Sequence, residues 1–84
     1  MSSKDDVLII EDSPAICMLL KNYLEKLGYT QIHTCTNGAT SIETFKELVS
    51  LEKHPIVLLD YMLPDMDARS ILTQMLEVQP NARV

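Results

Sequence analysis

Ile56-Val57-Leu58-Leu59-Asp60 is the stretch that decides the fold, and Tyr61-Met62-Leu63-Pro64-Asp65-Met66-Asp67 follows it directly. Four consecutive apolar residues without alternation, bounded by Pro55 and Pro64, indicate a strand that is buried on both faces, as in a parallel sheet covered by helices. Asp60 then lies at the carboxyl end of this strand. In open α/β sheets, functional sites form at that edge, where the strand order changes.

A second strand of the same kind lies near the start of the chain. Val7-Leu8-Ile9-Ile10 is again a continuous apolar run, and Glu11 and Asp12 follow it. The carboxyl ends of parallel strands meet at one edge of a sheet. If the two strands are neighbours, the side chains of Glu11, Asp12 and Asp60 converge at that edge.

A helix is predicted to begin directly after this first strand. Ser13 offers an N-cap oxygen, and Pro14 suits the first helical position because an N–H there would have no partner in the helix. Gly28 is expected to end the helix in the left-handed conformation. The apolar positions of this helix repeat at the spacing of one face, which predicts a face packed on the sheet; they are Ile16, Leu19, Leu20, Tyr23, Leu24 and Leu27.

The rest of the chain continues the alternation of strands and helices. In order we expect a more exposed strand over residues 30–36, a helix over 39–51, the apolar strand over 56–59, a helix over 71–78 and, at 83–84, the start of a fourth strand. Asn37-Gly38 could form a hairpin turn, but no strand pattern resumes after it. The order βαβαβα implies parallel strands with right-handed connections, and the polar second strand belongs on the outside. The predicted strand order is 2-1-3.

Composition limits the function classes. The 84 residues suffice for one domain, and 46% hydrophobic residues argue against disorder. A net charge of −5 argues against a nucleic-acid-binding surface and is compatible with a cation site. Cys17 and Cys35 have no metal-ligand or redox-motif spacing, and no signal peptide or membrane-spanning run is present. We therefore expect a soluble cytoplasmic protein with reduced thiols.

Three carboxylates at one sheet edge repel one another unless a cation binds among them. Mg²⁺ is the natural occupant, because it prefers oxygen ligands and uses few of them from the protein. Two carboxylates could hold the ion while the third attacks a phosphoryl group, which is a known strategy of covalent catalysis. Asp60 is the better nucleophile candidate because it precedes an irregular loop, whereas Glu11 and Asp12 share one turn and suit ligands.

These motifs resemble those of a known family. The run from Val7 to Pro14, the Asn37-Gly38 pair and the run from Ile56 to Asp67 together look like the receiver domain of two-component response regulators. The resemblance covers essentially the whole chain. It implies a flavodoxin-like α/β fold and a role as a phosphoprotein in phosphorelay signalling.

The resemblance also implies roles for single residues. Asp60 falls on the position that accepts phosphate from the phosphohistidine of a sensor histidine kinase or phosphotransfer protein. Glu11 and Asp12 fall on the acidic pair that binds Mg²⁺ together with Asp60, and Met62 falls on the position whose backbone carbonyl completes the coordination. Such a domain is a phosphoacceptor rather than an enzyme, and catalyses at most its own phosphorylation and dephosphorylation.

Two departures from the family pattern are visible. Ala68 replaces a glycine after the phosphoacceptor loop, which suggests an adjusted loop because Ala disfavours positive φ. A full receiver also has a Ser or Thr after its fourth strand and a Lys after its fifth, and the sequence stops at the onset of the fourth. We therefore expect a single truncated receiver over residues 1–84, or a fragment of a longer one. An open apolar edge on the third strand predicts a homodimer.

Two other function classes are compatible with parts of this pattern. A non-catalytic interaction or dimerisation module could keep the receiver half-fold without phosphorelay activity. A haloacid-dehalogenase-type phosphatase also uses a strand-end Asp, but it requires a second Asp two residues later, where this chain has Met62. The nearby Asp65 and Asp67 are expected to be solvated.

Overall fold

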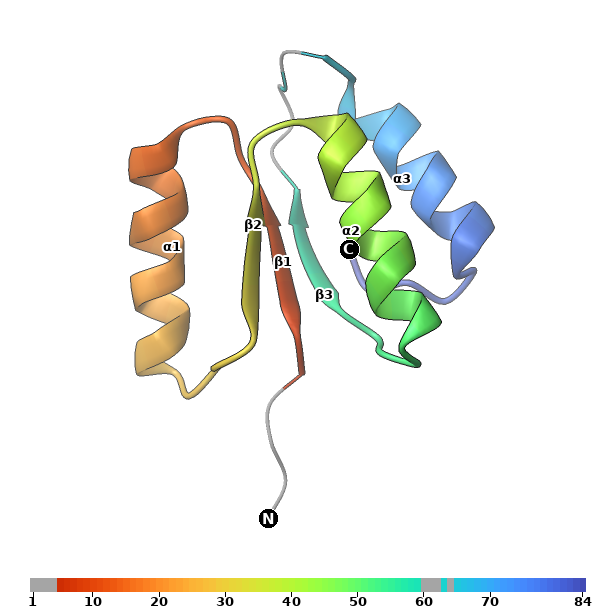
Figure 1. Cartoon of the computed structure of the whole chain (residues 1–84). Coiled ribbons are helices and arrows are strands. Elements are labelled where there is room, and N and C mark those ends of the chain that lie inside the picture. Colours follow the sequence, from red (N-terminus) through yellow and green to blue (C-terminus); the bar gives the residue numbers. More distant parts are fainter. Residues whose placement is uncertain (1–4, 60–62, 64) are drawn as a thin grey trace.

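The computed structural model describes residues 5–59, 63 and 65–84, and within them three strands alternate with three helices (Figure 1). The elements are β1 (Val7–Ile10), α1 (Pro14–Lys26), β2 (Ile32–Cys35), α2 (Gly38–Ser50), β3 (Ile56–Leu59) and α3 (Ala68–Val78). Their order is the predicted one. Both apolar strands have the predicted bounds.

The three strands form a parallel sheet in the order β2-β1-β3, which confirms the predicted order 2-1-3. The register pairs Ile10 of β1 with Cys35 of β2 and with Leu59 of β3, so all three strands end at the same level. A bridge from Ile56 to Arg83 extends the sheet beyond β3, and the Val57 N–H donates to the Arg83 carbonyl oxygen at 2.8 Å. A further strand therefore begins to pair where the sequence predicts it.

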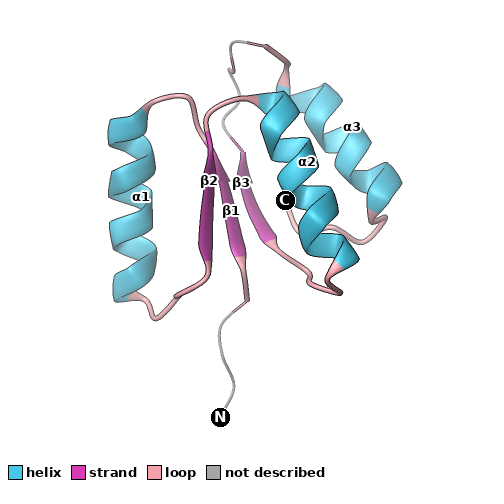
Figure 2. Cartoon of the chain, in the orientation of Figure 1, coloured by secondary structure: helices cyan, strands magenta, loops and turns pink. Residues whose placement is uncertain are grey.

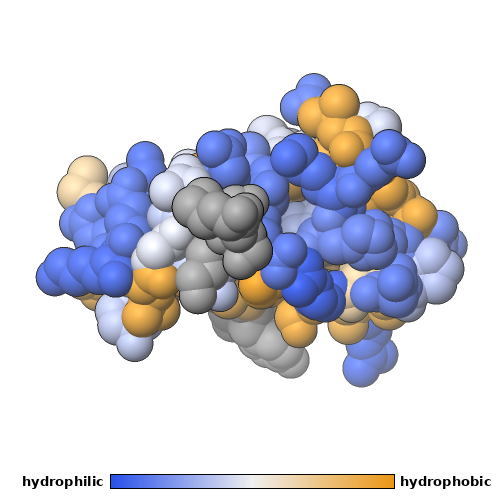
Figure 3. All heavy atoms as spheres, turned by 90° about the horizontal axis from the view of Figure 1, so that it is seen from below, coloured by the Kyte–Doolittle hydropathy of each residue, from blue (hydrophilic) through white to orange (hydrophobic). Residues whose placement is uncertain are grey.

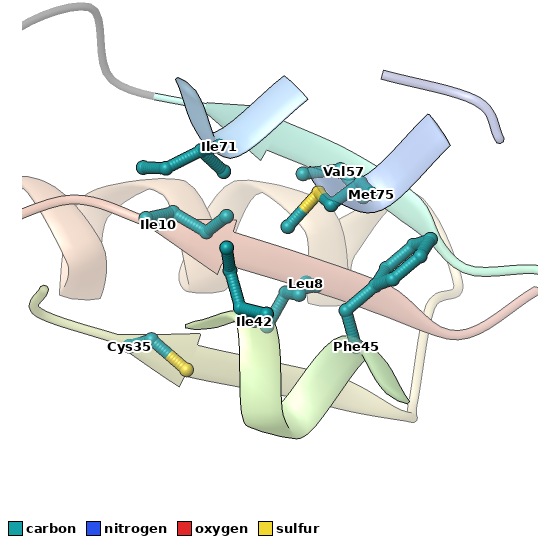
Figure 4. Packing of buried hydrophobic residues seen from close by; sticks show 8 residues of the cluster. All are labelled: Leu8, Ile10, Cys35, Ile42, Phe45, Val57, Ile71 and Met75. Carbon is teal, nitrogen blue, oxygen red and sulfur yellow. The ribbon is translucent and has the colours of Figure 1, made fainter. Parts of the chain in front are cut away.

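The helices cover the two faces of the sheet unequally. Helix α1 lies on one face, whereas α2 and α3 lie together on the other (Figure 2). The larger core fills the space between the sheet and the pair α2 and α3, and Figure 4 shows its eight buried side chains pointing toward one another. They are Leu8, Ile10, Cys35, Ile42, Phe45, Val57, Ile71 and Met75.

Helix α1 packs on the sheet by a narrower face than the sequence predicts. Cys17 is buried, and Leu20 and Leu24 pack partly buried against Val7 and Ile9. Four of the predicted core positions are instead exposed: Ile16 (43%), Leu19 (65%), Tyr23 (62%) and Leu27 (49%). The prediction that the whole apolar face packs on the sheet is therefore wrong. The described residues place no second helix beside α1 on this face, so the far side of its apolar stripe has nothing to pack on.

Helix termini follow local sequence signals. The Ile16 N–H donates to Ser13 Oγ at 3.4 Å, and Gly28 has a φ of 99°, so both predicted caps of α1 are confirmed. Asn37 is the N-cap of α2 rather than part of a hairpin turn, and its Oδ1 accepts the Thr40 N–H at 2.8 Å. None of the described helices is long and apolar enough to cross a membrane.

The amino end of the sheet is fastened by polar contacts. Asp6, directly before β1, lies with Oδ2 3.0 Å from Nε2 of His33, and its Oδ1 accepts from Lys53 Nζ at 3.5 Å. These contacts join β1 to β2 and to the connection before β3. Figure 3, which views the molecule from this end, shows a mainly hydrophilic surface with small separate hydrophobic areas.

Candidate functional site at the carboxyl edge of the sheet

The carboxyl ends of β1 and β3 are neighbours, as the proposed site requires. Ile10 and Leu59 are paired, and the residues that follow them in the sequence are Glu11 and Asp60. Asp60 and Met62 lie outside the described residues, so their predicted roles stay predictions. The structure confirms that the two strands are neighbours and that they end at the same level.

Glu11 is half-buried, and both its backbone and its carboxylate form hydrogen bonds. Its N–H donates to the Cys35 carbonyl oxygen at 3.0 Å, and its own carbonyl oxygen accepts from Cys17 Sγ at 3.3 Å. Its Oε2 accepts the Ser13 N–H at 3.2 Å. The neighbouring Asp12 is exposed. The acidic pair therefore combines one carboxylate held by the β1–α1 turn with one open to solvent.

The electrostatics of this edge are negative. Burial raises the pKa of the Cys17 thiol, and the nearby charges of Glu11 and Asp12 raise it further. Cys17 is therefore a protonated packing residue rather than a nucleophile. Within the described part of the chain, no three His, Cys, Asp or Glu side chains cluster closely enough to hold a metal ion. Carboxylate oxygens are nevertheless the donors that Mg²⁺ prefers, so the acidic pair fits that ion in chemistry.

Two acidic side chains after β3 have roles that the sequence analysis missed. Asp65 Oδ1 accepts the Gly38 N–H at 2.7 Å and Oδ2 accepts the Ala39 N–H at 3.0 Å, both at the start of α2. Asp67 is the N-cap of α3, and its Oδ1 accepts the Ser70 N–H at 2.7 Å. Both residues are exposed to solvent, as expected, and in addition each accepts backbone N–H groups that the sequence did not predict.

These hydrogen bonds change the acidity of both carboxyl groups. The Gly38 N–H and then the Ala39 N–H lower the pKa of Asp65, and the Ser70 N–H lowers the pKa of Asp67. A local signal exists for Asp67, because an Asp directly before a helical pattern is a common N-cap. Asp65 has no such signal, since its partners lie 26 and 27 residues away in the sequence.

The replacement of glycine by Ala68 causes no strain. Ala68 is the first residue of α3, and among the described non-glycine residues only Glu52 has a positive φ. The position is therefore helical, where Ala is preferred over Gly.

Comparison with known proteins identifies the family. The model of the response regulator receiver domain matches residues 7–84. The chain belongs to this receiver family. It is 33% identical over 78 residues to "Chemotaxis protein CheY" of Thermotoga maritima, an alignment that covers 93% of this chain and 62% of that protein. It is 36% identical over 73 residues to "Transcriptional regulatory protein SrrA" of Staphylococcus aureus, covering 87% of this chain and 28% of that protein.

The receiver assignment accounts for the architecture described above. A parallel sheet with order 2-1-3 and alternating helices corresponds to the flavodoxin-like arrangement, with its switch of direction between β1 and β3. The chain spans about three-fifths of the CheY relative and under a third of the SrrA relative. Membership of the receiver family makes this chain a signalling module.

Proposed function

We propose that this receiver accepts a phosphoryl group on Asp60 in two-component phosphorelay signalling, with Mg²⁺ held by Glu11, Asp12, Asp60 and the backbone carbonyl of Met62. The observation that carries the proposal is the pairing of Ile10 with Leu59. This register ends both apolar strands at one level, and a carboxylate residue follows each of them in the sequence.

The proposed transfer is a displacement at phosphorus. A carboxylate oxygen of Asp60 attacks the phosphorus of a phosphohistidine, an O–P bond forms, and the N–P bond breaks. The electron pair of that bond stays on the imidazole nitrogen, which takes up a proton. Mg²⁺ bound at this edge would neutralise charge on the transferring oxygens. The carboxylates of Glu11 and Asp12 would repel a negatively charged phosphoryl group, so a bound cation is needed to offset this repulsion.

The proposed donor is a sensor histidine kinase or a phosphotransfer protein, and the domain itself acts as a phosphoacceptor rather than as an enzyme with a separate substrate. The cytoplasm is the proposed location. The free thiols of Cys17 and Cys35, both buried, support a reducing compartment. The surplus of acidic residues supports a module that binds neither nucleic acid nor membrane directly.

The second candidate function is an interaction module that forms a homodimer and needs no phosphate. The exposed apolar side chains of α1 favour it, because Leu19 and Tyr23 are 65% and 62% exposed on consecutive turns. A second copy could cover them. The two functions differ in their dependence on Asp60, since only the phosphoacceptor requires that carboxylate.

The test is labelling by phosphoramidate, a small phosphodonor, at a series of Mg²⁺ concentrations. We expect Mg²⁺-dependent labelling of the wild type and none in Asp60→Asn. Asp12→Asn should be labelled only at Mg²⁺ concentrations higher by on the order of tenfold or more, because it removes one charged ligand. Labelling that ignores both Mg²⁺ and Asp60 would refute the phosphoacceptor.

Light scattering on the same samples measures the mass of the protein in solution and distinguishes the interaction module from the phosphoacceptor. A stable dimer whose mass ignores the donor, in a protein that takes up no phosphate, would favour the interaction module. Leu19→Lys should then yield a monomer, because it places a charge in the apolar surface of α1.

A further inference from the structure

The connection between β3 and α3 is fastened to α2 by a long-range polar contact. Both carboxylate oxygens of Asp65 accept backbone N–H groups, from Gly38 at 2.7 Å and from Ala39 at 3.0 Å. Figure 1 shows the described part of this connection at the same end of the molecule as the start of α2. Hydrogen bonds to a charged acceptor at these distances belong to the stronger class.

These bonds complete the N-terminus of α2. The first N–H groups of a helix have no partner within it and must be satisfied from outside. Asn37 supplies the acceptor for Thr40 N–H, and Asp65 supplies acceptors for Gly38 and Ala39. The start of α2 therefore depends on a residue from a different connection, and that connection in turn depends on α2.

A second contact holds the same connection from the next residue. A Cβ atom added to Gly38 would lie 2.9 Å from both Cβ and Sδ of Met66 and 3.1 Å from Cδ1 of Ile71. Real Cβ atoms do not approach that closely, so this packing requires glycine at position 38. Met66 also packs against the larger core.

We propose that Asp65 is a positioning residue for the phosphoacceptor segment, because its carboxylate ties the chain after β3 to the N–H groups of Gly38 and Ala39. This inference rests on the proposed function of Asp60. Asp65 follows Asp60 by five residues, and β3 fixes the chain on the other side at Leu59. The described residues on either side of Asp60 are therefore each bonded to another element, Leu59 in the sheet and Asp65 at the start of α2.

The anchor is rigid because α2 is itself fixed by the core. Phe45 is fully buried and Ile42 is nearly so, both in the cluster beneath α2 and α3. A defined backbone after Asp60 matters in this proposal because the carbonyl of Met62 is one of the proposed ligands of Mg²⁺. Loss of the anchor should therefore weaken Mg²⁺ binding and slow phosphoryl transfer.

Asp67 provides the matched control for Asp65. It is an exposed aspartate of the same connection, it also caps a helix, and it carries the same charge, but its bond to Ser70 is local to α3. Replacing either residue removes one negative charge near the edge. Of these two aspartates, Asp65 is the one whose carboxylate joins the connection to α2.

The experiment measures Mg²⁺-dependent phosphoramidate labelling of the wild type, Asp60→Asn, Asp65→Ala, Asp65→Asn and Asp67→Ala at a temperature where circular dichroism shows each variant folded. We expect the labelling rate of Asp65→Ala to fall on the order of tenfold or more, which is the effect of a small displacement of reacting groups. The labelling rate of Asp67→Ala should stay within about twofold of the wild-type rate. Asp65→Asn should fall between them because its amide oxygen can still accept one N–H.

Gly38→Ala gives an independent arm, because it pushes Met66 away without altering any charge. It should slow labelling and raise the Mg²⁺ requirement as Asp65→Ala does. If the wild type is labelled at Asp60 but Asp65→Ala matches Asp67→Ala, the positioning role is overturned and the phosphoacceptor stands. If the wild type takes up no phosphate, or Asp60→Asn takes up as much, the proposed function fails and the positioning role fails with it.

Discussion

Gly28 and Glu52 occupy the same position at the ends of two different helices. After α1 the Tyr29 N–H donates to Leu24 O and the Gly28 N–H donates to Glu25 O, both at 3.1 Å. After α2 the equivalent pair runs from Lys53 to Leu48 and from Glu52 to Val49, at 3.1 and 2.9 Å. This is the Schellman arrangement, and its left-handed residue is usually glycine.

The first prediction concerns this left-handed position. Glu52 has a φ of 62° and Gly28 a φ of 99°. Glu52→Gly should stabilise the fold by about 0.5–1 kcal/mol, because relief of the left-handed strain outweighs the greater freedom of glycine in the unfolded chain. Gly28→Ala should destabilise it by about 1 kcal/mol for the opposite reason. Urea unfolding measures both.

Glu52→Ala is the control for this pair. It removes the carboxylate but keeps a Cβ atom, so its stability should stay close to that of the wild type. A gain for Ala as large as that for Gly would show that charge, rather than backbone conformation, decides stability at this position.

At the scale of elements, the N-termini of α2 and α3 depend on carboxylates. Asp65 binds the start of α2 and Asp67 the start of α3, and backbone N–H groups lower the pKa of both carboxyl groups from 3.8. A lowered folded-state pKa means that the carboxylates stabilise the fold above the unfolded value. This stabilisation is lost as the pH falls through the lowered folded values.

The second prediction follows from that sign. The melting temperature of the wild type should fall on acidification below about pH 4, where the unfolded carboxyl groups begin to take up protons. Asp65→Asn and Asp67→Asn should each be less stable than the wild type near neutral pH and lose less on acidification. Thermal melts from near-neutral pH to about pH 3 measure this. Equal acid slopes in all three proteins would contradict the role of these carboxylates.

The elements themselves were largely predictable from sequence. The apolar runs of β1 and β3 gave exact bounds, and the polar β2 fell on the outside, because burial on two faces leaves a clear pattern. The role of Asp65 was not predictable, since its partners lie on another element. The exposure of Leu19 and Tyr23 was also missed, because periodicity reveals an apolar face but not how much of it a neighbour covers.

At the scale of the whole molecule, the two faces of the sheet carry unequal shares of the core. Among the described residues, the buried cluster on the side of α2 and α3 has eight members, whereas Val7, Ile9 and Cys17 form the buried cluster on the side of α1. Stability should therefore be most sensitive to changes beneath α2 and α3. The exposed side of α1 should tolerate substitution.

The third prediction compares one aromatic residue from each side. Phe45 is fully buried and Tyr23 is 62% exposed. Phe45→Ala should cost about 3–5 kcal/mol, a large share of the total stability of a small domain. Tyr23→Ala should change stability by no more than about 0.5 kcal/mol. Urea unfolding of a dilute sample measures both, and a comparable loss in Tyr23→Ala would show that α1 is covered in solution.

In the proposed function, the carboxyl edge of β1 and β3 accepts phosphate at one residue. The most direct test is to treat the full chain with phosphoramidate and Mg²⁺ and to locate the modified residue by mass spectrometry. We expect a single phosphoryl group on Asp60, absent without Mg²⁺ and absent from Asp60→Asn. A protein that stays unmodified, or one that carries the phosphate on another residue, would contradict it.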